Sequence, residues 1–268
     1  GVLALIVVSS VMNGFEAQLK DRILGVVPHG VITTESGQLA NWQQYQQTVM
    51  QLPHVQAAAP FITTEGMVQS PGSLAPIALQ GLDPQNYPKQ DLLRQTLGHA
   101  ALERLVAGKF NIILGGALAQ KLGVMPGDKV RVLVSEGSRF TPMGRVPSQR
   151  LFHVVALFDV GSPVDDQIAL IHLDDARRLL RYQPENVTGW RVWLDDAFQT
   201  EDIAKTALPS SLVFQDWRQE RGELFRAVAM EKHIMSLMLV LIILVAAFNI
   251  LSALVMVVLD KQGEVAIL

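Results

Sequence analysis

Aspartate pairs and histidines are the residues of this chain whose types could support acid–base or metal chemistry. Adjacent carboxylates can act as a catalytic dyad or hold a cation, and three such pairs occur: Asp165-Asp166, Asp174-Asp175 and Asp195-Asp196. Each stands at an apparent loop or helix start, where aspartate commonly accepts hydrogen bonds from backbone N–H groups and complements the helix dipole. The six histidines show neither HxxxH nor HxH spacing, and the chain has no cysteine. We therefore expect capping or solvation, with no catalytic residue and no metal site.

A glycine-containing turn is the next place where chemistry could be expected. Leu114-Gly115-Gly116-Ala117 follows a predicted strand but matches neither the GxGxxG nor the GxxxxGK pattern of phosphate-binding loops. We expect it to ease a strand-to-helix turn, and we expect this chain to bind no cofactor. The formal net charge is −3 and no basic run occurs, so nucleic acid is not an expected partner.

A long segment, Ser135–Arg150, lies between two predicted strands, Lys129–Val134 and Leu151–Phe158. Hairpin loops usually take about 2–5 residues, so this segment is too long for a tight turn. Its two prolines fix φ and remove backbone donors, so we do not expect its middle to be an ordinary central strand.

The same segment combines apolar side chains with positive charge. Its apolar residues include Phe140, Met143 and Val146, and its arginines are Arg139, Arg145 and Arg150. A stiffened arm with an apolar tip and a basic base suits docking on a partner, because a pre-set shape lowers the ordering cost of binding. The alternative is a long loop folded onto its own domain.

Apolar segments at both ends of the chain indicate a membrane. Ile234–Leu259 is 26 residues long and carries no charge, which exceeds the roughly 20 residues needed to cross a bilayer. Val2–Val11 is too short to span alone, and we interpret it as part of a spanning helix that continues as an amphipathic one. We expect the chain to be an excerpt of a longer protein that leaves the membrane, builds a domain of about 200 residues and returns.

The middle of the chain alternates short strands and short helices. We expect strands at 31–34, 55–59, 63–69, 76–81, 111–114, 129–134, 151–158, 168–172 and 188–194. We expect helices at 41–52, with Asn41 as N-cap, and at 90–98, 116–122, 174–182 and 200–207. Mixed strands with interspersed helices predict an α+β fold, divided into two lobes.

Three sequence segments resemble one known family. They are Ser10–Glu16 (SVMNGFE), Arg139–Arg150 (RFTPMGRVPSQR) and Asp260–Leu268 (DKQGEVAIL). Together they are similar to the membrane subunits of the Lol lipoprotein-releasing ABC transporters of Gram-negative bacteria, the LolC/LolE/LolF family, with the LolC type the most similar. Val26–Gly30 looks closer to the LolE type, which leaves a merged LolF-type subunit open.

The resemblance implies a MacB-like α+β periplasmic domain flanked by transmembrane helices of the inner membrane. The expected organisation is the end of the first transmembrane helix and its extension (1–27), the periplasmic domain (28–216) with a protruding hairpin arm (135–150), the stem and second transmembrane helix (217–259), and the start of a cytoplasmic coupling segment (260–268). The implied partners are the periplasmic carrier LolA, the ATPase LolD that binds the ATP, a sister LolE or a second copy, triacylated lipoproteins and membrane lipid.

The resemblance also assigns binding roles to individual residues. The hook that enters the carrier matches Phe140, Thr141, Pro142, Met143, Gly144, Arg145, Val146 and Pro147. The pad that contacts the rim of the carrier matches Arg131, Gln149 and Arg150, and the segment that couples to the ATPase matches Glu264, Val265, Ala266 and Leu268. Methionine suits a lipid-lined hollow because it is flexible and polarizable, and arginine offers paired donors to carboxylates.

Two other functions are compatible with parts of this pattern. The first is a related mechanotransmission subunit, either MacB-like in efflux or FtsX-like in the regulation of cell-wall hydrolases. Those relatives have no need of a hook that fits a lipoprotein carrier, so the arm discriminates against them. The second is a membrane-tethered enzyme, which the lack of a credible catalytic set disfavours. We therefore expect a non-catalytic transport subunit.

Overall fold

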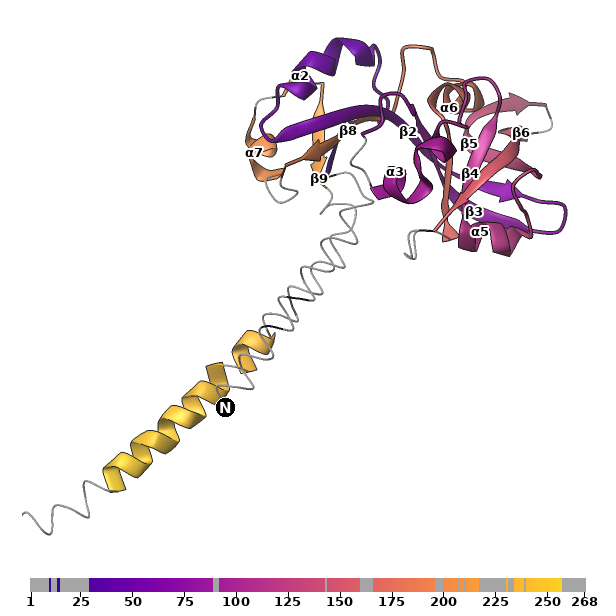
Figure 1. Cartoon of the computed structure of the whole chain (residues 1–268). Coiled ribbons are helices and arrows are strands. Elements are labelled where there is room, and N and C mark those ends of the chain that lie inside the picture. The colour runs from indigo at the N-terminus through magenta and orange to yellow at the C-terminus, as the bar shows by residue number, and fades with distance from the viewer. Residues whose placement is uncertain are drawn as a thin grey trace, which may run out of the picture. The chain divides into compact units, whose positions relative to one another are not determined.

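Two compact units make up the chain in the computed structural model (Figure 1). Asp21–Trp217 forms one unit, and Gly1–Lys20 together with Arg218–Leu268 forms the other. The structure describes residues 10, 14, 29–88, 92–142, 144–159, 166–195, 200–206, 208–209, 211–216, 230, 234–238 and 240–256. The larger unit carries all the strands that lie in these ranges.

The larger unit is a mixed α+β domain, as the sequence predicts. Its described strands are β1 (Gly30–Thr33), β2 (Val55–Gln69), β3 (Leu74–Leu82), β4 (Asn111–Gly115), β5 (Lys129–Thr141), β6 (Gly144–Phe158), β7 (Ile168–His172), β8 (Gly189–Leu194) and β9 (Val213–Asp216). Its described helices are the 3-10 helix η1 (Trp42–Tyr45), α2 (Gln46–Met50), α3 (Leu92–Leu97), α4 (His99–Leu102), α5 (Gly116–Leu122), α6 (Leu173–Leu180) and α7 (Thr200–Lys205).

Strand β2 joins two lobes of this domain. Its second half pairs with both β3 and β5, and the order β3-β7-β4-β6-β5 then closes these strands into a ring with β2. Its first half pairs instead with β8, beyond which lie β1 and β9 (Figure 1). One continuous strand therefore belongs to the ring and to the smaller β8-β1-β9 sheet, and the prediction of two lobes is confirmed.

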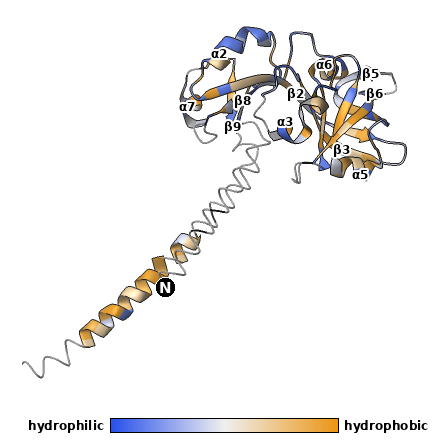
Figure 2. Cartoon of the chain, viewed as in Figure 1, coloured by the Kyte–Doolittle hydropathy of each residue, from blue (hydrophilic) through white to orange (hydrophobic). Residues whose placement is uncertain are grey.

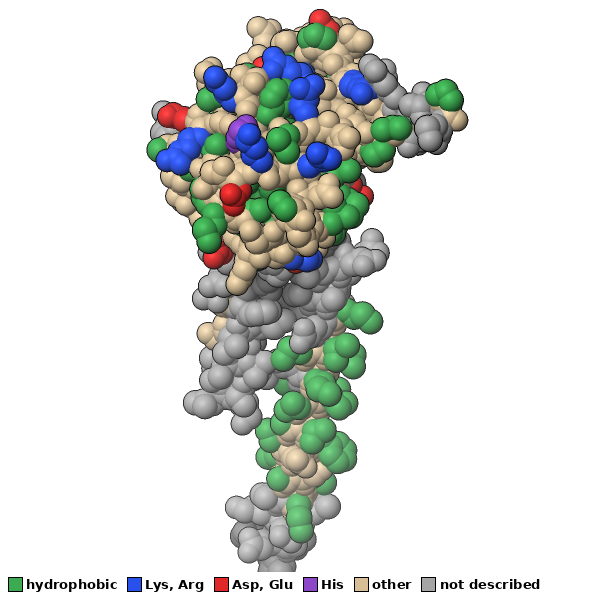
Figure 3. All heavy atoms as spheres, turned by 90° about the vertical axis from the view of Figure 1, so that its right-hand side faces the viewer, with side chains coloured by type: hydrophobic (Ala, Val, Ile, Leu, Met, Phe, Trp, Pro, Cys, Tyr) green, Lys and Arg blue, Asp and Glu red, His purple; other side chains and the backbone are tan. Residues whose placement is uncertain are grey.

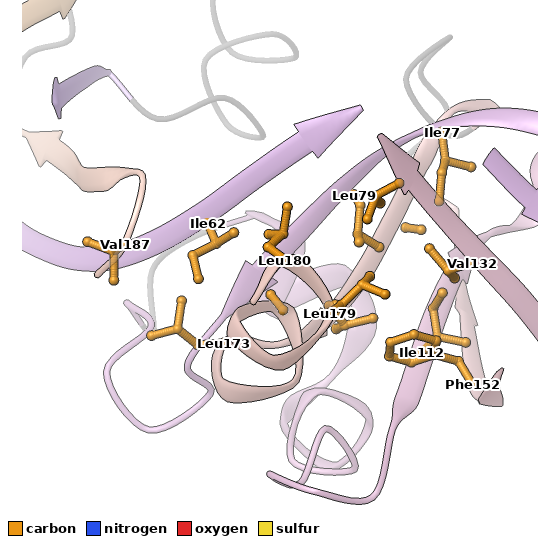
Figure 4. Packing of buried hydrophobic residues seen from close by; sticks show 14 of the residues in the cluster. Ile62, Ile77, Leu79, Ile112, Val132, Phe152, Leu173, Leu179, Leu180 and Val187 are labelled. Carbon is orange, nitrogen blue, oxygen red and sulfur yellow. The ribbon is translucent and has the colours of Figure 1, made fainter. Parts of the chain in front are cut away.

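The main core packs the apolar side of helix α6 against the strands. Leu173, Leu179 and Leu180 point from the helix toward strand residues that include Leu79 and Phe152 (Figure 4). The spacing of these leucines is that of the buried face of an amphipathic helix. The helix begins after His172, whose Nδ1 accepts the N–H of Asp174, so a histidine rather than an aspartate provides the cap.

A second cluster lies under helices α3 and α4. It joins Leu93 and Leu102 of these helices to Ile113, Phe158 and other buried residues of the strands. The two clusters lie on opposite sides of β4, because neighbouring residues of one strand, Ile112 and Ile113, belong to different clusters.

Two local predictions are wrong. Residues 55–59 and 63–69 form one strand rather than two, because Pro60 lies where pairing with β3 has not yet begun and its missing N–H leaves no gap in that ladder. Asn41 does not cap an α-helix: its backbone is left-handed, with φ of 49°, its side chain makes no capping bond, and the helix that follows opens as 3-10.

The smaller unit contains one described helix that is long and apolar enough to cross a membrane. Ile234–Met256 has 23 residues and a mean hydropathy of 2.8, and Figure 2 shows its hydrophobic colouring. Its described side chains are exposed rather than packed in a core. At 1.5 Å per residue it extends about 35 Å, which is more than the roughly 30 Å hydrocarbon thickness of a bilayer. The predicted first membrane helix at 2–11 and the segment 260–268 fall outside the described residues, apart from Ser10.

Candidate functional site

The predicted arm is a β-hairpin. Strands β5 and β6 continue to its tip, with Arg139 paired to Val146 and Thr141 to Gly144. Residues 142 and 143 connect these paired ends, and of the two the structure describes Pro142. The strands run further into the arm than the predicted 129–134 and 151–158, because the prolines fall where a ladder tolerates them: Pro142 between the paired ends and Pro147 opposite a bulge.

The hairpin leaves the sheet at that bulge. Val134 pairs with Ser148, and Arg139 is the next residue of β5 to pair, so the four residues 135–138 stand opposite Pro147 alone. A bulge bends its strand and increases the local twist. Strand β2 pairs with β5 only as far as Val134, so beyond the bulge the hairpin has two strands and no third neighbour within the described ranges.

The tip of the hairpin depends on a glycine. Gly144 has φ of 117°, a conformation that side-chain-bearing residues rarely adopt. Pro142, which lies before Gly144, and Val146, which lies after it, are both exposed. Met143 lies outside the described residues, and for Phe140, Thr141 and Arg145 the structure describes only the backbone.

The base of the hairpin is fixed to the C-terminal end of helix α6. The buried hydroxyl of Ser148 donates a hydrogen bond of 2.6 Å to the carbonyl of Leu179. Gly137 packs so closely against the carbonyl of Leu180 that a Cβ at this position would overlap it. The Tyr182 hydroxyl donates to Oε1 of Glu136 at 3.2 Å. The arm therefore has a fixed root.

The three predicted pad residues do not share one face. Arg131 pairs with Leu151 and is exposed, and Gln149 lies two residues from Leu151 on the same side of the hairpin. Arg150 pairs with the buried Val132 and points to the opposite side, where its guanidinium lies 4.6 Å from the centre of the Phe110 ring. The structure brings Arg131 and Gln149 together and places Arg150 apart.

A buried aspartate supports the ring beneath Arg150. Asp175 is fully buried and accepts the backbone N–H groups of Gly108 at 2.8 Å and Phe110 at 3.0 Å. Phe110 has φ of 53° and its ring packs edge-to-face on Phe152. Asp175 therefore acts through Phe110 as a positioning residue for Arg150, a role that the sequence did not indicate.

Apolar side chains accompany the basic residues on the outer side of the ring. Met67 and Leu151 are 40% and 46% exposed, and the pairing of β2 with β5 and of β5 with β6 sets them beside Leu133 and Arg131. Figure 3 shows lysine and arginine side chains interspersed with exposed apolar ones at this end of the domain. Sequence reasoning missed Met67 and Leu151; the signal available was their outward position in alternating strands.

The structure does not describe the predicted coupling residues Glu264, Val265, Ala266 and Leu268. The predicted strand-to-helix role of Gly115 is confirmed, since it is the N-cap of α5.

Comparison with known proteins gives a consistent family. Residues 1–208 match the model of the MacB-like periplasmic core domain. The whole chain is 39% identical over 269 residues to the lipoprotein-releasing system transmembrane protein LolC of Haemophilus influenzae and covers 66% of it. It is 35% identical over 272 residues to LolC of Xylella fastidiosa strain 9a5c, covering 65%, and 30% identical over 275 residues to LolE of H. influenzae, covering 66%.

Among solved structures, the periplasmic region of MacB from Actinobacillus actinomycetemcomitans aligns with a TM-score of 0.41 and 11% identity. That alignment covers 75% of this chain and 95% of the other. The chain spans about two thirds, 65–66%, of the length of the LolC and LolE relatives.

Proposed function

Because the chain belongs to the MacB-like periplasmic core domain family, as a LolC/LolE-type membrane subunit, we propose that it serves an ATP-driven lipoprotein-release transporter of the Gram-negative inner membrane. In this proposal the domain faces the periplasm and recruits the soluble carrier LolA through the β5–β6 hairpin. The membrane helix then belongs to the part of the subunit that meets lipoprotein and lipid.

The observation that carries this proposal is the hairpin, which has a fixed root and strands that pair as far as Thr141 and Gly144. Its root is fixed by Ser148 and Gly137 on helix α6, and its tip is set by Gly144. A probe that must enter a narrow lipid-binding mouth benefits from this combination, because little conformational freedom is lost on binding. A loop packed on its own domain would not leave Pro142 and Val146 exposed.

The pad extends the proposed contact beyond the tip. Arg131 and Gln149, with the exposed Leu151 between them, offer hydrogen-bond donors around an apolar centre. This composition, with arginine near apolar groups, is typical of protein interfaces. Arg150 on the other side of the hairpin would contact a carrier only if the carrier surrounds the arm, and otherwise stabilises Phe110.

The subunit itself is proposed to be non-catalytic. ATP hydrolysis is assigned to a separate ATPase, LolD, with Glu264, Val265, Ala266 and Leu268 as the coupling residues. The complex would contain a LolE-type sister or a second copy of this subunit, and its cargo would be triacylated lipoproteins. The chain would relay the motion of the ATPase to the periplasmic domain.

The test is a photocrosslink from position 143 of the full-length subunit in lipid nanodiscs to purified LolA. A specific adduct that disappears when the cavity of the carrier is filled with lipid supports the proposal. A probe at Met50, exposed in the other lobe, is the control and should give no adduct. If position 143 gives none while the subunit is folded, carrier recruitment is refuted and a MacB-like or FtsX-like mechanotransmission role takes its place.

A further inference from the structure

An open groove of about 770 Å³ lies at the end of the outer face of β6, away from the hairpin tip. Two cationic residues of the segment before β4, Arg104 and Lys109, line it together with Asn111 and His153. His153 pairs with Asn111 on one side and with Lys129 on the other, so a third cationic residue stands next to the lining.

The segment that carries the two cations is held in place. The side-chain amide of Asn111 donates to the carbonyl of Arg104 at 2.6 Å, and Nη1 of Arg104 donates to the carbonyl of Val155 at 3.1 Å. The N–H of Gly108 is bound by the buried Asp175. A ligand would therefore meet donors whose backbone is already positioned, which lowers the cost of binding.

The described lining of the groove carries positive charge and no negative charge. Its lining contains no acidic residue, and the ion pairs between described residues involve His54, His172, Arg177 and Arg178 instead. Asp128, which follows the lining, directs its carboxylate to the N–H of Met125. A guanidinium and an ammonium facing an open space favour carboxylates as ligands.

The groove continues the pad. Gln149, Leu151 and His153 occupy every second position of β6 and so lie on the same face of the strand. His153, which lines the groove, is therefore four residues, or roughly 13 Å, from Gln149. A stable protein interface covers about 800 Å² on each partner, which corresponds to a patch about 28 Å across. A carrier seated on Arg131 and Gln149 would thus reach the groove.

We propose that this groove is a second docking site for the same carrier, receiving a cluster of its aspartate and glutamate side chains. The inference rests on the proposed recruitment of LolA and adds that acidic side chains of the carrier bind basic side chains of this domain. Hook and pad would fix the carrier at one end, and the groove would fix its rotation about the arm. Attraction between opposite charges also raises the association rate, and it weakens as salt increases.

The test compares affinities of full-length subunits in nanodiscs for LolA at low and high salt. Arg104→Gln combined with Lys109→Gln removes two positive charges from the groove. Its matched control, Gln44→Glu combined with Gln47→Glu, changes the charge by the same amount at exposed positions of the other lobe. We expect the groove variant to bind about tenfold more weakly at roughly 50 mM salt, with the difference disappearing near 0.5 M, and the control to bind as the unmodified subunit does.

A photocrosslinker at Val106, a lining residue that is 47% exposed, tests the site without changing its charge. We expect an adduct that maps to an acidic segment of the carrier. Equal affinities of the groove variant and the control, or no adduct from position 106, would overturn the second site, and hook binding would still stand if Met143→Glu abolishes it. If Met143→Glu instead binds the carrier as tightly as the unmodified subunit does, the recruitment proposal itself is refuted.

Discussion

Ser148 ties the docking hairpin to the rest of the domain. Its buried hydroxyl donates to the Leu179 carbonyl in the last turn of α6. We expect Ser148→Ala to lower the free energy of unfolding by about 1–2 kcal/mol, because it leaves a buried carbonyl without its donor. Hydrogen–deuterium exchange of residues 135–150 in the full-length protein should also accelerate. Ser135→Ala, at an exposed position of the same arm, should change neither quantity, and equal effects of both variants would contradict the anchoring role.

Tyr182 gives the root of the arm a dependence on alkaline pH. Burial raises the pKa of its hydroxyl above the ordinary value of 10.0; a hydrogen bond with Gln38 lowers it, and the charge and hydrogen bond of Glu136 raise it further. The folded state therefore holds this proton more tightly than the unfolded state. Its contribution to stability is complete below pH 10 and is lost as the pH rises through the folded-state pKa.

We expect the melting temperature of the unmodified protein to fall more steeply above about pH 10 than that of Tyr182→Phe, which has no proton to lose at this site. Thermal unfolding of both proteins between about pH 8 and pH 11 measures the difference. An absorbance titration should find one tyrosine fewer with a raised pKa in the variant. Parallel curves over the whole range would show that Tyr182 ionises alike in both states.

At the residue scale, the sequence predicted types of interaction better than partners. An aspartate of the Asp174-Asp175 pair does accept backbone N–H groups, as predicted, but Asp175 takes them from Gly108 and Phe110, 67 and 65 residues away. The partner could not be predicted, because it depends on which loop the fold brings to the start of α6. The stacking of Arg150 on Phe110 escaped prediction for the same reason.

The elements of the domain follow their local patterns except where tertiary pairing decides. Strands β4 and β7 and helix α5 were predicted within a residue of their ends. The four-residue elements α4 and β9 were missed, since so short a segment carries no periodicity. The strands of the hairpin arm were predicted too short, because its ladder contains Pro147, whose compensating bulge is a property of the opposite strand.

Gly144 sets the shape of the hairpin tip. Its φ of 117° is strained for any residue with a Cβ, at a cost of about 1–3 kcal/mol, although open space surrounds the position. We expect Gly144→Ala to weaken LolA binding several-fold by distorting the turn rather than by a clash. Gly72→Ala, in a turn that also has open space and no positive φ, is the matched control. Unchanged affinity in Gly144→Ala would mean that the turn adapts to the carrier.

Strand alternation makes the two pad arginines unequal. Arg131 faces the pad side, while Arg150 lies over Phe110 on the other side of the hairpin. We expect Arg131→Glu to weaken carrier binding in low salt with little change in stability. Arg150→Glu should lower stability by about 0.5–1 kcal/mol through loss of the cation–π contact. The double variant should bind most weakly at low salt, and its deficit should shrink most as salt increases, because salt screens the repulsion between the new glutamates and the carrier. Carrier affinity and melting temperature should be measured for all three variants. If the two single variants have the same affinity and the same melting temperature, the arginines do not have the different roles proposed here.

At the scale of the whole molecule, the closure of the ring was beyond sequence reasoning. It depends on β2 pairing with β3 and β5 at one end and with β8 at the other. These pairings join residues up to 139 positions apart, as Val55 and Leu194 are, and no local pattern encodes which strand edges meet. The separation into a charge-free helix and a mixed domain, in contrast, was readable because composition alone distinguishes them.

Because the membrane helix and the periplasmic domain are separate units, we expect that one substitution can abolish carrier docking without affecting ATP hydrolysis by the partner ATPase. Position 143 follows Pro142, which is exposed, and neither buried cluster includes a described side chain of residues 139–146. We expect Met143→Glu in the reconstituted transporter to abolish LolA binding and transfer of lipoprotein to it, because a charge in a lipid-binding mouth is poorly solvated. Folding of the domain and the basal ATP hydrolysis of the partner should remain unchanged.

Three measurements on one preparation decide this: carrier affinity, lipoprotein transfer and basal ATP hydrolysis. Met50→Glu, an equally drastic change at an exposed methionine of the other lobe, should leave all three as they are. If Met143→Glu lowers transfer and hydrolysis together, the hairpin takes part in the ATPase cycle and does more than recruit the carrier. If it lowers neither, the hairpin is not the docking element, because a charge at the tip of a docking element would reduce the transfer of lipoprotein to the carrier.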